Sequence, residues 1–176
     1  MSESGFEKGR YVVYGTNGIC IIEDVKSMKF AAGMPEKIYY ILSPVGNPTS
    51  TVFVPAENEK LVSKMRSVMT KNEIDELLIG MRDKELQWEN DRRYRSENFH
   101  EILSKGVTQE MLLMIRCIYM KKRELSKMGK NLPTTDSNTL KAAEKLVEEE
   151  FSYTLDVKPS EVSRYIRGVL QIEDED

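Results

Sequence analysis

Residues that commonly carry out catalysis or bind metals are scarce in this chain of 176 residues, which has one histidine, two cysteines and one tryptophan. Cys20 and Cys117 lie far apart and form no Cys-x-x-Cys pair, which argues against zinc and favours free buried thiols. Nothing near His100 indicates Cys–His catalysis, and neither a G-x-G-x-x-G nor a G-x-x-x-x-G-K-S/T phosphate loop is present. We therefore expect no enzyme, no catalytic residue, no metal and no cofactor.

Long apolar runs and low-complexity tracts are absent as well. No segment approaches the ~20 apolar residues that a membrane-spanning helix needs. The first five residues, Met1 to Gly5, are polar and acidic, unlike a secretory signal. These absences predict a soluble cytoplasmic protein without a membrane partner, whose two thiols stay reduced.

Charge is distributed unevenly, although the net charge of the chain is only −3. Residues 91–130 carry a net charge of +5, whereas residues 144–176 carry −6. A local basic face sets the electrostatic field within a Debye length, so an acidic chain can still bind DNA. The acidic total argues only against a protein that coats nucleic acid indiscriminately.

The first part of the chain has the short β-branched and aromatic runs that are typical of strands. Asn17-Gly18 between two such runs predicts a tight hairpin, and Pro55 is expected to end another strand. This pattern predicts an α+β protein that begins with a small SH3- or Tudor-like β-barrel. The expected strands are residues 10–14, 18–25, 38–42, 50–54 and a shorter one within 64–69.

Helical periodicity follows from residue 70 onward. Thr70 and Glu73 have the form of a capping box and predict a helix over 70–81. We expect a C-terminal bundle of about five helices, which places the domains at 1–69 and 70–172, followed by an acidic tail at 173–176. The other helices are expected from Asn90 or Asp91 to Leu103, and from Thr108, from Asp136 or Ser137, and from Pro159.

Trp88 stands just ahead of a cluster of arginines, Arg92, Arg93 and Arg95. An aromatic ring can stack on an exposed base step or wedge against it, while guanidinium groups hold phosphates. The alternative is that Trp88 caps a hydrophobic core and that the arginines form a solvated helix face.

A set of segments, taken in order and spacing, resembles the CarD/CdnL family of bacterial transcription regulators from about residue 6 to residue 170. The N-terminal module of that family is shared with the transcription–repair coupling factor. The matching segments are Gly9–Gly18, Val52–Asn58, Trp88 with Arg92–Arg95, Ile118–Leu125 and Lys141–Leu146.

The resemblance implies two partners. A Tudor-like domain would bind the β subunit of RNA polymerase by adding a strand at its edge, here residues 38–42 and 51–54. Some members carry an arginine where this chain has Phe53, so an apolar contact would replace an ionic one. The implied polymerase-binding residues are Lys29, Ile38, Tyr40, Thr51 and Phe53.

The helical domain of the family lies on promoter DNA at the upstream edge of the melted bubble, where an aromatic wedge and cations favour the open complex. Many members have one residue between the tryptophan and Arg-Arg-Tyr, whereas this chain has three, which would rotate Trp88 by about 200° on a continuous helix. A loop before a cap at Asn90 would absorb that difference. Of the expected DNA-binding residues, Trp88 would be the wedge, and Arg92, Arg93, Lys121, Lys122 and Arg123 would bind phosphates without recognising sequence. The full expected set is Trp88, Arg92, Arg93, Arg95, Lys121, Lys122, Arg123, Lys127, Lys130 and Lys141.

Two other functions remain open at this point. One is an RNA-binding SH3-like barrel protein that acts at the ribosome, although residues 1–81 carry a net charge of −1, which disfavours it. The other is a protein-only interaction scaffold whose basic helices dock an acidic partner. For the favoured reading we expect a monomer whose partners are the RNA polymerase β subunit and promoter DNA.

Overall fold

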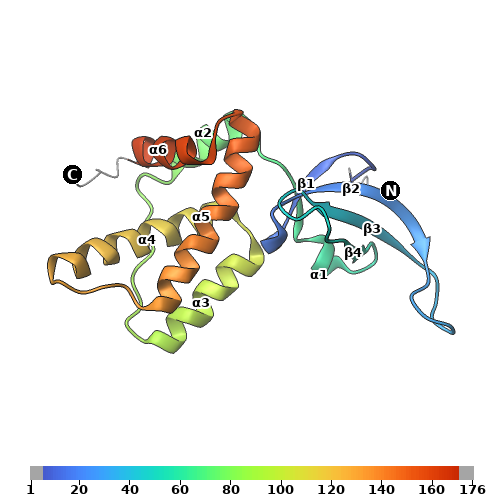
Figure 1. Ribbon diagram of the computed structural model, residues 1–176, viewed down its shortest axis with the longest axis horizontal. Coiled ribbons are helices and arrows are strands. Elements are labelled where there is room, and N and C mark those ends of the chain that lie inside the picture. The colour runs from blue at the N-terminus through green and yellow to red at the C-terminus, as the bar shows by residue number, and fades with distance from the viewer. Residues whose placement is uncertain (1–5, 171–176) are drawn as a thin grey trace. The chain divides into compact units, whose positions relative to one another are not determined.

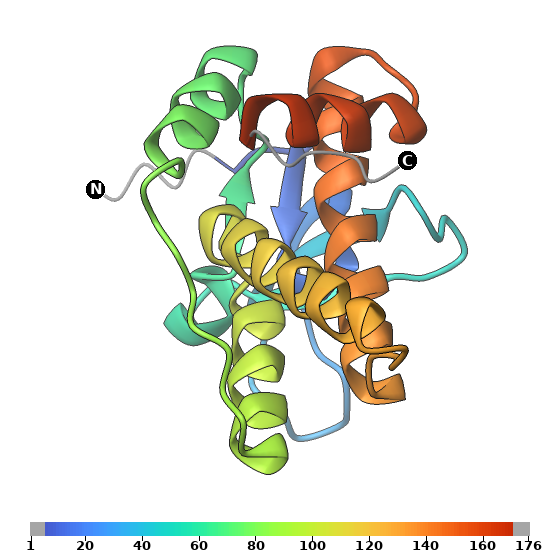
Figure 2. The ribbon, with the colours of Figure 1, turned by 90° about the vertical axis from the view of Figure 1, so that its left-hand side faces the viewer.

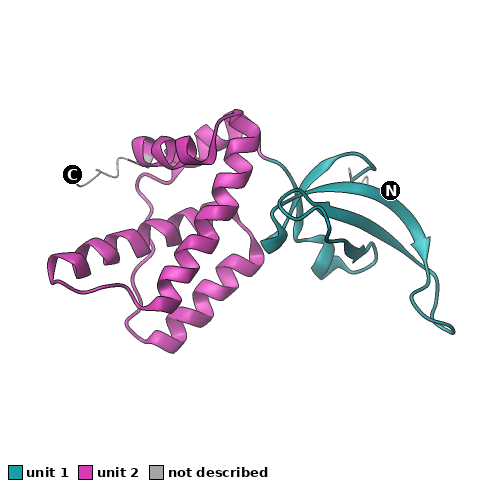
Figure 3. Cartoon of the chain, viewed as in Figure 1, with its two compact units in different colours: residues 1–68 teal, residues 69–176 magenta. Residues whose placement is uncertain are grey.

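The computed structural model describes residues 6–170. The chain divides into two compact units, residues 1–68 and residues 69–176 (Figure 3). The acidic tail expected at 173–176 lies outside the described residues. No helix in the described range is long and apolar enough to cross a membrane.

Unit 1, residues 1–68, contains an antiparallel sheet of five strands in the order β4-β3-β2-β1-β5 (Figure 1). A short helix, α1 (Glu59–Val62), lies between the last two strands in the chain. All five strand predictions are confirmed, with shifted ends. The strands are β1 (Tyr11–Tyr14), β2 (Ile19–Met28), β3 (Lys37–Pro44), β4 (Val52–Pro55) and β5 (Met65–Ser67).

The sheet is open, so the predicted closed barrel is not found. Closure would require pairing between β4 and β5, which are the two edges of the sheet and have only four and three residues. The chain between them instead forms α1, whose Leu61 and Val62 pack against the apolar core of the sheet.

One face of the sheet is buried. Alternate residues of neighbouring strands, such as Tyr40 and Leu42 on β3 and Val54 on β4, point to the same core. The expected turn at Asn17-Gly18 is a short 3-10 turn, Gly15–Asn17, after which Gly18 takes a positive φ of 68°. That conformation favours glycine and lets the chain reverse into β2.

Unit 2, residues 69–176, holds five helices in its described part, as the sequence predicts. The predicted capping box is present, because the Thr70 N–H donates to Glu73 Oε2 at 2.7 Å and the Glu73 N–H donates to Thr70 Oγ1 at 3.3 Å. The helices are α2 (Lys71–Gly80), α3 (Arg92–Lys105), α4 (Thr108–Lys127), α5 (Thr134–Leu155) and α6 (Pro159–Leu170).

Local signals set the ends of α3. Asp91 is the N-cap and accepts the Tyr94 N–H at 2.9 Å, and Gly106 ends the helix with φ 67°. The helix predicted from Asp136 or Ser137 instead starts two residues earlier, at Thr134, directly after Pro133. Pro133 occupies the N-cap position with φ −52° and ψ 143°, so the helix begins at the residue that follows it.

The core of unit 2 lies between α4, α5 and the helices that flank them (Figure 2). Apolar residues at helical spacing form this core. On α4, for example, they lie along one side of the helix, and only that side is buried. Its fully buried members include Ile74, Leu78, Leu112, Ile118, Ala143, Phe151 and Val162.

Residues 82–91, here called the 82–91 segment, connect α2 to α3. In Figure 2 this segment is the thin yellow-green trace that runs past α4. After the turn that follows α2, it forms neither a helix nor a strand. Trp88 therefore lies in an irregular segment ahead of the Asp91 cap. The loop absorbs the unusual spacing between Trp88 and the arginines, and the helical rotation of about 200° does not arise.

Candidate functional sites

Trp88 is partly buried, and its ring lies between the core of unit 2 and solvent. It packs edge to face on the buried Phe99, with ring centroids 6.2 Å apart. The Arg95 Cζ lies 4.3 Å from the Trp88 ring centroid, and the Lys121 Nζ lies 5.7 Å from it. Both distances fall within the range of cation–π attraction. The two readings of Trp88 are thus combined, since the ring packs on the bundle and keeps part of its surface accessible.

Arg95 is a correction to the predicted DNA-binding set. Only 4% of the residue is exposed, and its guanidinium donates from Nε to Asp136 Oδ1 at 3.0 Å and from Nη2 to Asp136 Oδ2 at 2.8 Å. Its Nη1 donates to the carbonyl oxygen of Glu89 at 2.8 Å. A guanidinium that is buried and engaged in this way cannot reach a phosphate, so the DNA contact predicted for Arg95 is wrong.

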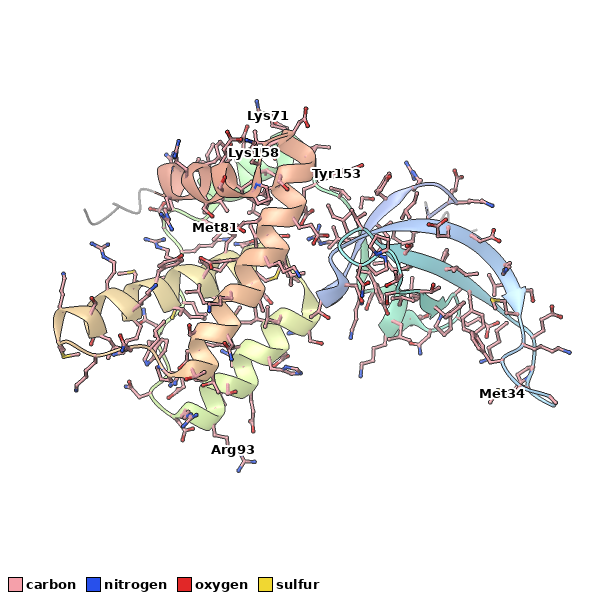
Figure 4. The ribbon with its side chains drawn as sticks, in the orientation of Figure 1. Met34, Lys71, Met81, Arg93, Tyr153 and Lys158 are labelled. Carbon is pink, nitrogen blue, oxygen red and sulfur yellow. The ribbon has the colours of Figure 1, made fainter. Side chains whose placement is uncertain are left out.

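The exposed cations gather at one end of unit 2. Arg93, labelled in Figure 4, points away from the bundle, with 90% of its side chain exposed and an ion pair to Glu97 at 3.1 Å. The Arg95–Asp136 pair joins the start of α3 to the start of α5, and a short loop joins the end of α4 to the same place. We call this surface the basic end; its exposed cations are Arg92, Arg93, Lys122, Lys127, Lys130 and Lys141.

Two other predicted DNA contacts are less accessible. Lys121 has a side chain that is 19% exposed and paired with Glu124 at 3.1 Å, and Arg123 is half-buried. The Lys121 ammonium group therefore already contacts the Trp88 ring and the Glu124 carboxylate.

The charges at the start of α3 are unusual for a helix. The first turn carries Arg92 and Arg93 and no acidic residue, although the N-terminus of a helix has a partial positive charge. Cations there oppose the helix dipole and so slightly destabilise the helix. The Asp91 carboxylate at the N-cap accepts the Tyr94 N–H and offsets part of the dipole, while the side chains of Arg92 and Arg93 stay exposed beside it.

A shallow groove runs beside Trp88 between the 82–91 segment and α4. Leu86, Leu113 and Met120 line it, and the buried Cys117 lies at its floor. Burial raises the pKa of the Cys117 thiol, so it stays protonated at neutral pH and is a poor nucleophile. Charged and polar side chains, among them Glu85, Arg116 and Lys121, complete its lining, so the groove beside the Trp88 ring is mixed in character.

In unit 1, β4 is an edge strand. Among the residues that the structure describes, it pairs with β3 alone. Ala56, just after β4, donates its N–H to the carbonyl of Ile38 at 2.9 Å. Because inward and outward residues alternate along an antiparallel strand, the backbone N–H and C=O groups of Phe53 point outward, and Thr51 continues that series.

Aromatic side chains lie next to this edge. Phe30 is 53% exposed and makes edge-to-face contacts with Phe53 and Tyr39, at centroid distances of 5.2 Å and 4.9 Å. We call Phe30, Tyr39 and Phe53 the edge aromatic cluster. The sequence predicts a side-chain contact for Phe53 and includes Tyr39 only within the expected edge 38–42. The alternation of β3 indicates that Tyr39 faces opposite to the buried Tyr40, but no sequence signal places the loop residue Phe30.

Two further corrections concern the predicted polymerase contacts. Tyr40 is 6% exposed and lies in the core, so its side chain is not on the surface. Strand β3 pairs with both β2 and β4, so residues 38–42 are not a sheet edge. The side chains of Lys29, Ile38, Thr51 and Phe53 are all exposed.

Comparison with protein families gives one match. Residues 6–68, which span unit 1, match the CarD-like/TRCF RID domain. Unit 1 is a CarD-like/TRCF RID domain. The resemblance to the CarD family is confirmed over this part of the chain, and the domain indicates a transcription-related function that involves RNA polymerase. A search of curated proteins found no match to the chain.

Proposed function

We propose that this protein is a non-enzymatic transcription regulator that binds the β subunit of RNA polymerase through unit 1 and promoter DNA through the basic end of unit 2. Held in that way, it would stabilise the open promoter complex in the cytoplasm. The observation that carries the proposal is the CarD-like/TRCF RID domain, whose β4 strand presents an open edge.

Strand addition at β4 is the proposed mode of polymerase binding. The outward N–H and C=O groups of Phe53 would pair with a strand of the β subunit, and backbone pairing of this kind is tolerant of sequence. The edge aromatic cluster would add an apolar contact beside that ladder, so we expect an apolar side chain on the polymerase opposite Phe53. Pro55 lacks an N–H and limits the ladder to a short stretch.

Phosphate contacts are the proposed mode of DNA binding. The basic end combines exposed cations from α3, from α4 and the loop that follows it, and from α5. Cations on several helices that meet at one surface can follow a phosphate backbone without reading bases. Tethering to polymerase raises the local concentration of this surface near DNA, so weak intrinsic DNA affinity is sufficient.

Trp88 is the proposed wedge. Its partly exposed ring lines the groove between the 82–91 segment and α4, so it can contact an unstacked base step while the core side of the ring stays packed on Phe99. A ring inserted at the upstream edge of the bubble would oppose reannealing of the strands and lengthen the life of the open complex.

A backbone test separates this proposal from the protein-only and ribosomal alternatives. Phe53→Pro removes the outward N–H but leaves the inward hydrogen bonds to β3, whereas Phe53→Ala removes only the ring. In a pull-down of the polymerase β lobe by the full chain, Phe53→Pro should lose more binding than Phe53→Ala. Binding of Phe53→Pro at the parent level would contradict strand addition at β4.

A further inference from the structure

The guanidinium of Arg95 joins three separate parts of unit 2. It donates to both carboxylate oxygens of Asp136 on α5 and to the Glu89 carbonyl, and the side chains of the Arg95–Asp136 pair are only 5% and 4% exposed. It also lies 4.3 Å from the centroid of the Trp88 ring. Two of its contacts, those to Glu89 and Trp88, are to the 82–91 segment.

Joining α3 to α5 does not by itself require charge. Well-packed apolar side chains of similar volume can replace a buried ion pair without loss of stability. An apolar side chain could not donate a hydrogen bond to Glu89 or place a cation against the Trp88 ring. The features that only arginine supplies are therefore the ones directed at the 82–91 segment.

The 82–91 segment forms neither a helix nor a strand beyond the turn after α2, so bundle side chains and water supply the partners of its remaining backbone groups. Arg116 on α4 provides a second attachment, with Nη1 3.2 Å from the Lys84 carbonyl oxygen and 3.4 Å from that of Arg82. The segment is thus held at its start by Arg116 and at Trp88 and Glu89 by Arg95.

We propose that the Arg95–Asp136 pair is a positioning device that fixes the Trp88 ring and its segment in the orientation needed at DNA. Arg95 acts through Trp88 and touches no DNA itself. The inference rests on the proposed wedge role of Trp88. A ring already held in place loses little conformational freedom on binding, so fixing it beforehand strengthens the contact.

The first test reads the position of Trp88 directly. Trp88 is the only tryptophan, so the intrinsic fluorescence of the full chain reports on this ring alone. Removing the pair as a unit, with Arg95→Met and Asp136→Leu together, should raise acrylamide quenching of Trp88 and speed its local anisotropy decay. Circular dichroism at the same temperature should show that the helices are retained.

A matched control removes an exposed ion pair from the same helix. Lys105 and Glu101 on α3 are paired at 2.9 Å and lie away from Trp88, so Lys105→Gln with Glu101→Gln should leave the quenching constant unchanged. Arg95→Lys is the second test variant if the double variant does not fold. Lysine keeps the charge but cannot make the forked contacts, so quenching should rise to an intermediate level.

The second test reads function through a double-mutant cycle on open-complex lifetime. Removing the pair should shorten the lifetime roughly threefold or more in the parent, the size of coupling typical for contacting residues. In a Trp88→Ala background, removing the pair should have no further effect. Additive losses in the two backgrounds would contradict positioning through Trp88 and would point to general destabilisation.

The two tests fail separately. Unchanged quenching in both the double variant and Arg95→Lys would overturn the positioning role, whatever the open-complex lifetime of these variants. If Trp88→Ala left the open-complex lifetime at the parent value, the wedge itself would be wrong, and the functional part of this inference would fall with it.

Discussion

The two binding surfaces proposed for this chain differ in the chemical groups that they present. The β4 edge of unit 1 offers backbone groups beside the apolar edge aromatic cluster, whereas the basic end of unit 2 offers exposed cations on helix termini. A backbone ladder with apolar flanks is directional and nearly insensitive to salt. A surface of cations is adaptable and strongly salt-dependent. The difference indicates that unit 1 would decide which partner is bound and unit 2 would follow whatever DNA that partner presents.

The same contrast appears between two arginines on a single helix. Arg93 is exposed and paired only with its helical neighbour Glu97, while Arg95, two residues later, is buried against Asp136. Successive positions on a helix are about 100° apart, so two residues are enough to move a side chain from solvent to core. Their chemistry is identical and their expected roles are different, which makes them a sensitive test of the account.

The largest expected effect is on stability. Asp136→Ala leaves the Arg95 charge buried without its partner, and unit 2 should lose about 3–5 kcal/mol of unfolding free energy. Glu97→Ala removes the partner of the exposed Arg93 and should cost less than about 1 kcal/mol. Thermal or denaturant unfolding of both variants checks the comparison. Equal losses would show that Arg95 is not the buried structural residue described above.

The helix ends of α3 illustrate what the sequence could predict. Asp91 and Gly106 act on backbone groups within a few residues, so their effects can be read locally. The capping box of Thr70 and Glu73 is equally local. The strands were recognisable for the same reason, since alternation and turn residues are properties of adjacent positions.

What the sequence could not supply depends on contacts between distant residues. Asp136 lies 41 positions from Arg95, and no sequence pattern indicates that the two residues pair. Sequence alone therefore predicts the same DNA contact for Arg95 as for its exposed neighbours. Closure of the sheet depends on whether β4 and β5 meet, which local strand signals do not determine. Phe30 joins the edge aromatic cluster from a loop, where alternation gives no guidance.

The next prediction concerns Trp88. Trp88→Ala removes a ring that is partly buried against Phe99, so the stability loss should fall below the ~3–5 kcal/mol typical of a fully buried tryptophan. The open-complex lifetime on a slow-melting promoter should drop at the same time. Calorimetry and a competitor-challenge assay measure the two effects. A loss of stability at the top of that range, with the lifetime preserved, would assign Trp88 to the core alone.

Salt should affect DNA binding by unit 2 and leave polymerase binding by unit 1 almost unchanged. Replacing Lys127 and Lys130 by glutamine should reduce the slope of log affinity against log salt for DNA by about 2, if each lysine contacts one phosphate. The reduction should be similar for unrelated DNA sequences. Binding of the polymerase β lobe by the same variant should not change. A shift in polymerase binding would show that the two surfaces do not act separately.

The smallest expected effect is at the start of unit 2. Hydrogen bonds from Thr70 lower the pKa of the exposed Glu73 below its ordinary value of 4.5. The ionised Glu73 carboxylate therefore contributes stability above pH 4.5, and that part of the capping box is lost as the pH falls through the lowered pKa of the folded state. Thr70→Ala should cost about 1 kcal/mol at neutral pH. Most of that difference should remain in acid, because the Glu73 N–H donates to Thr70 Oγ1 whether or not the carboxyl is protonated. Only the part from the Thr70 hydroxyl to the Glu73 carboxylate should be lost as the pH falls. Unfolding of parent and variant at several pH values measures this, and a difference that vanished in acid would contradict the assigned capping bond.

The most direct test of the division of labour is an open-complex lifetime assay run at increasing protein concentration. Phe53→Pro weakens only the tether to polymerase, so a high concentration of this variant should restore the lifetime that the parent gives at low concentration. Trp88→Ala removes the contact that acts on DNA, so no concentration should restore it. Rescue of Trp88→Ala, or failure to rescue Phe53→Pro at saturating protein, would contradict the assignment of anchoring to unit 1 and bubble stabilisation to unit 2.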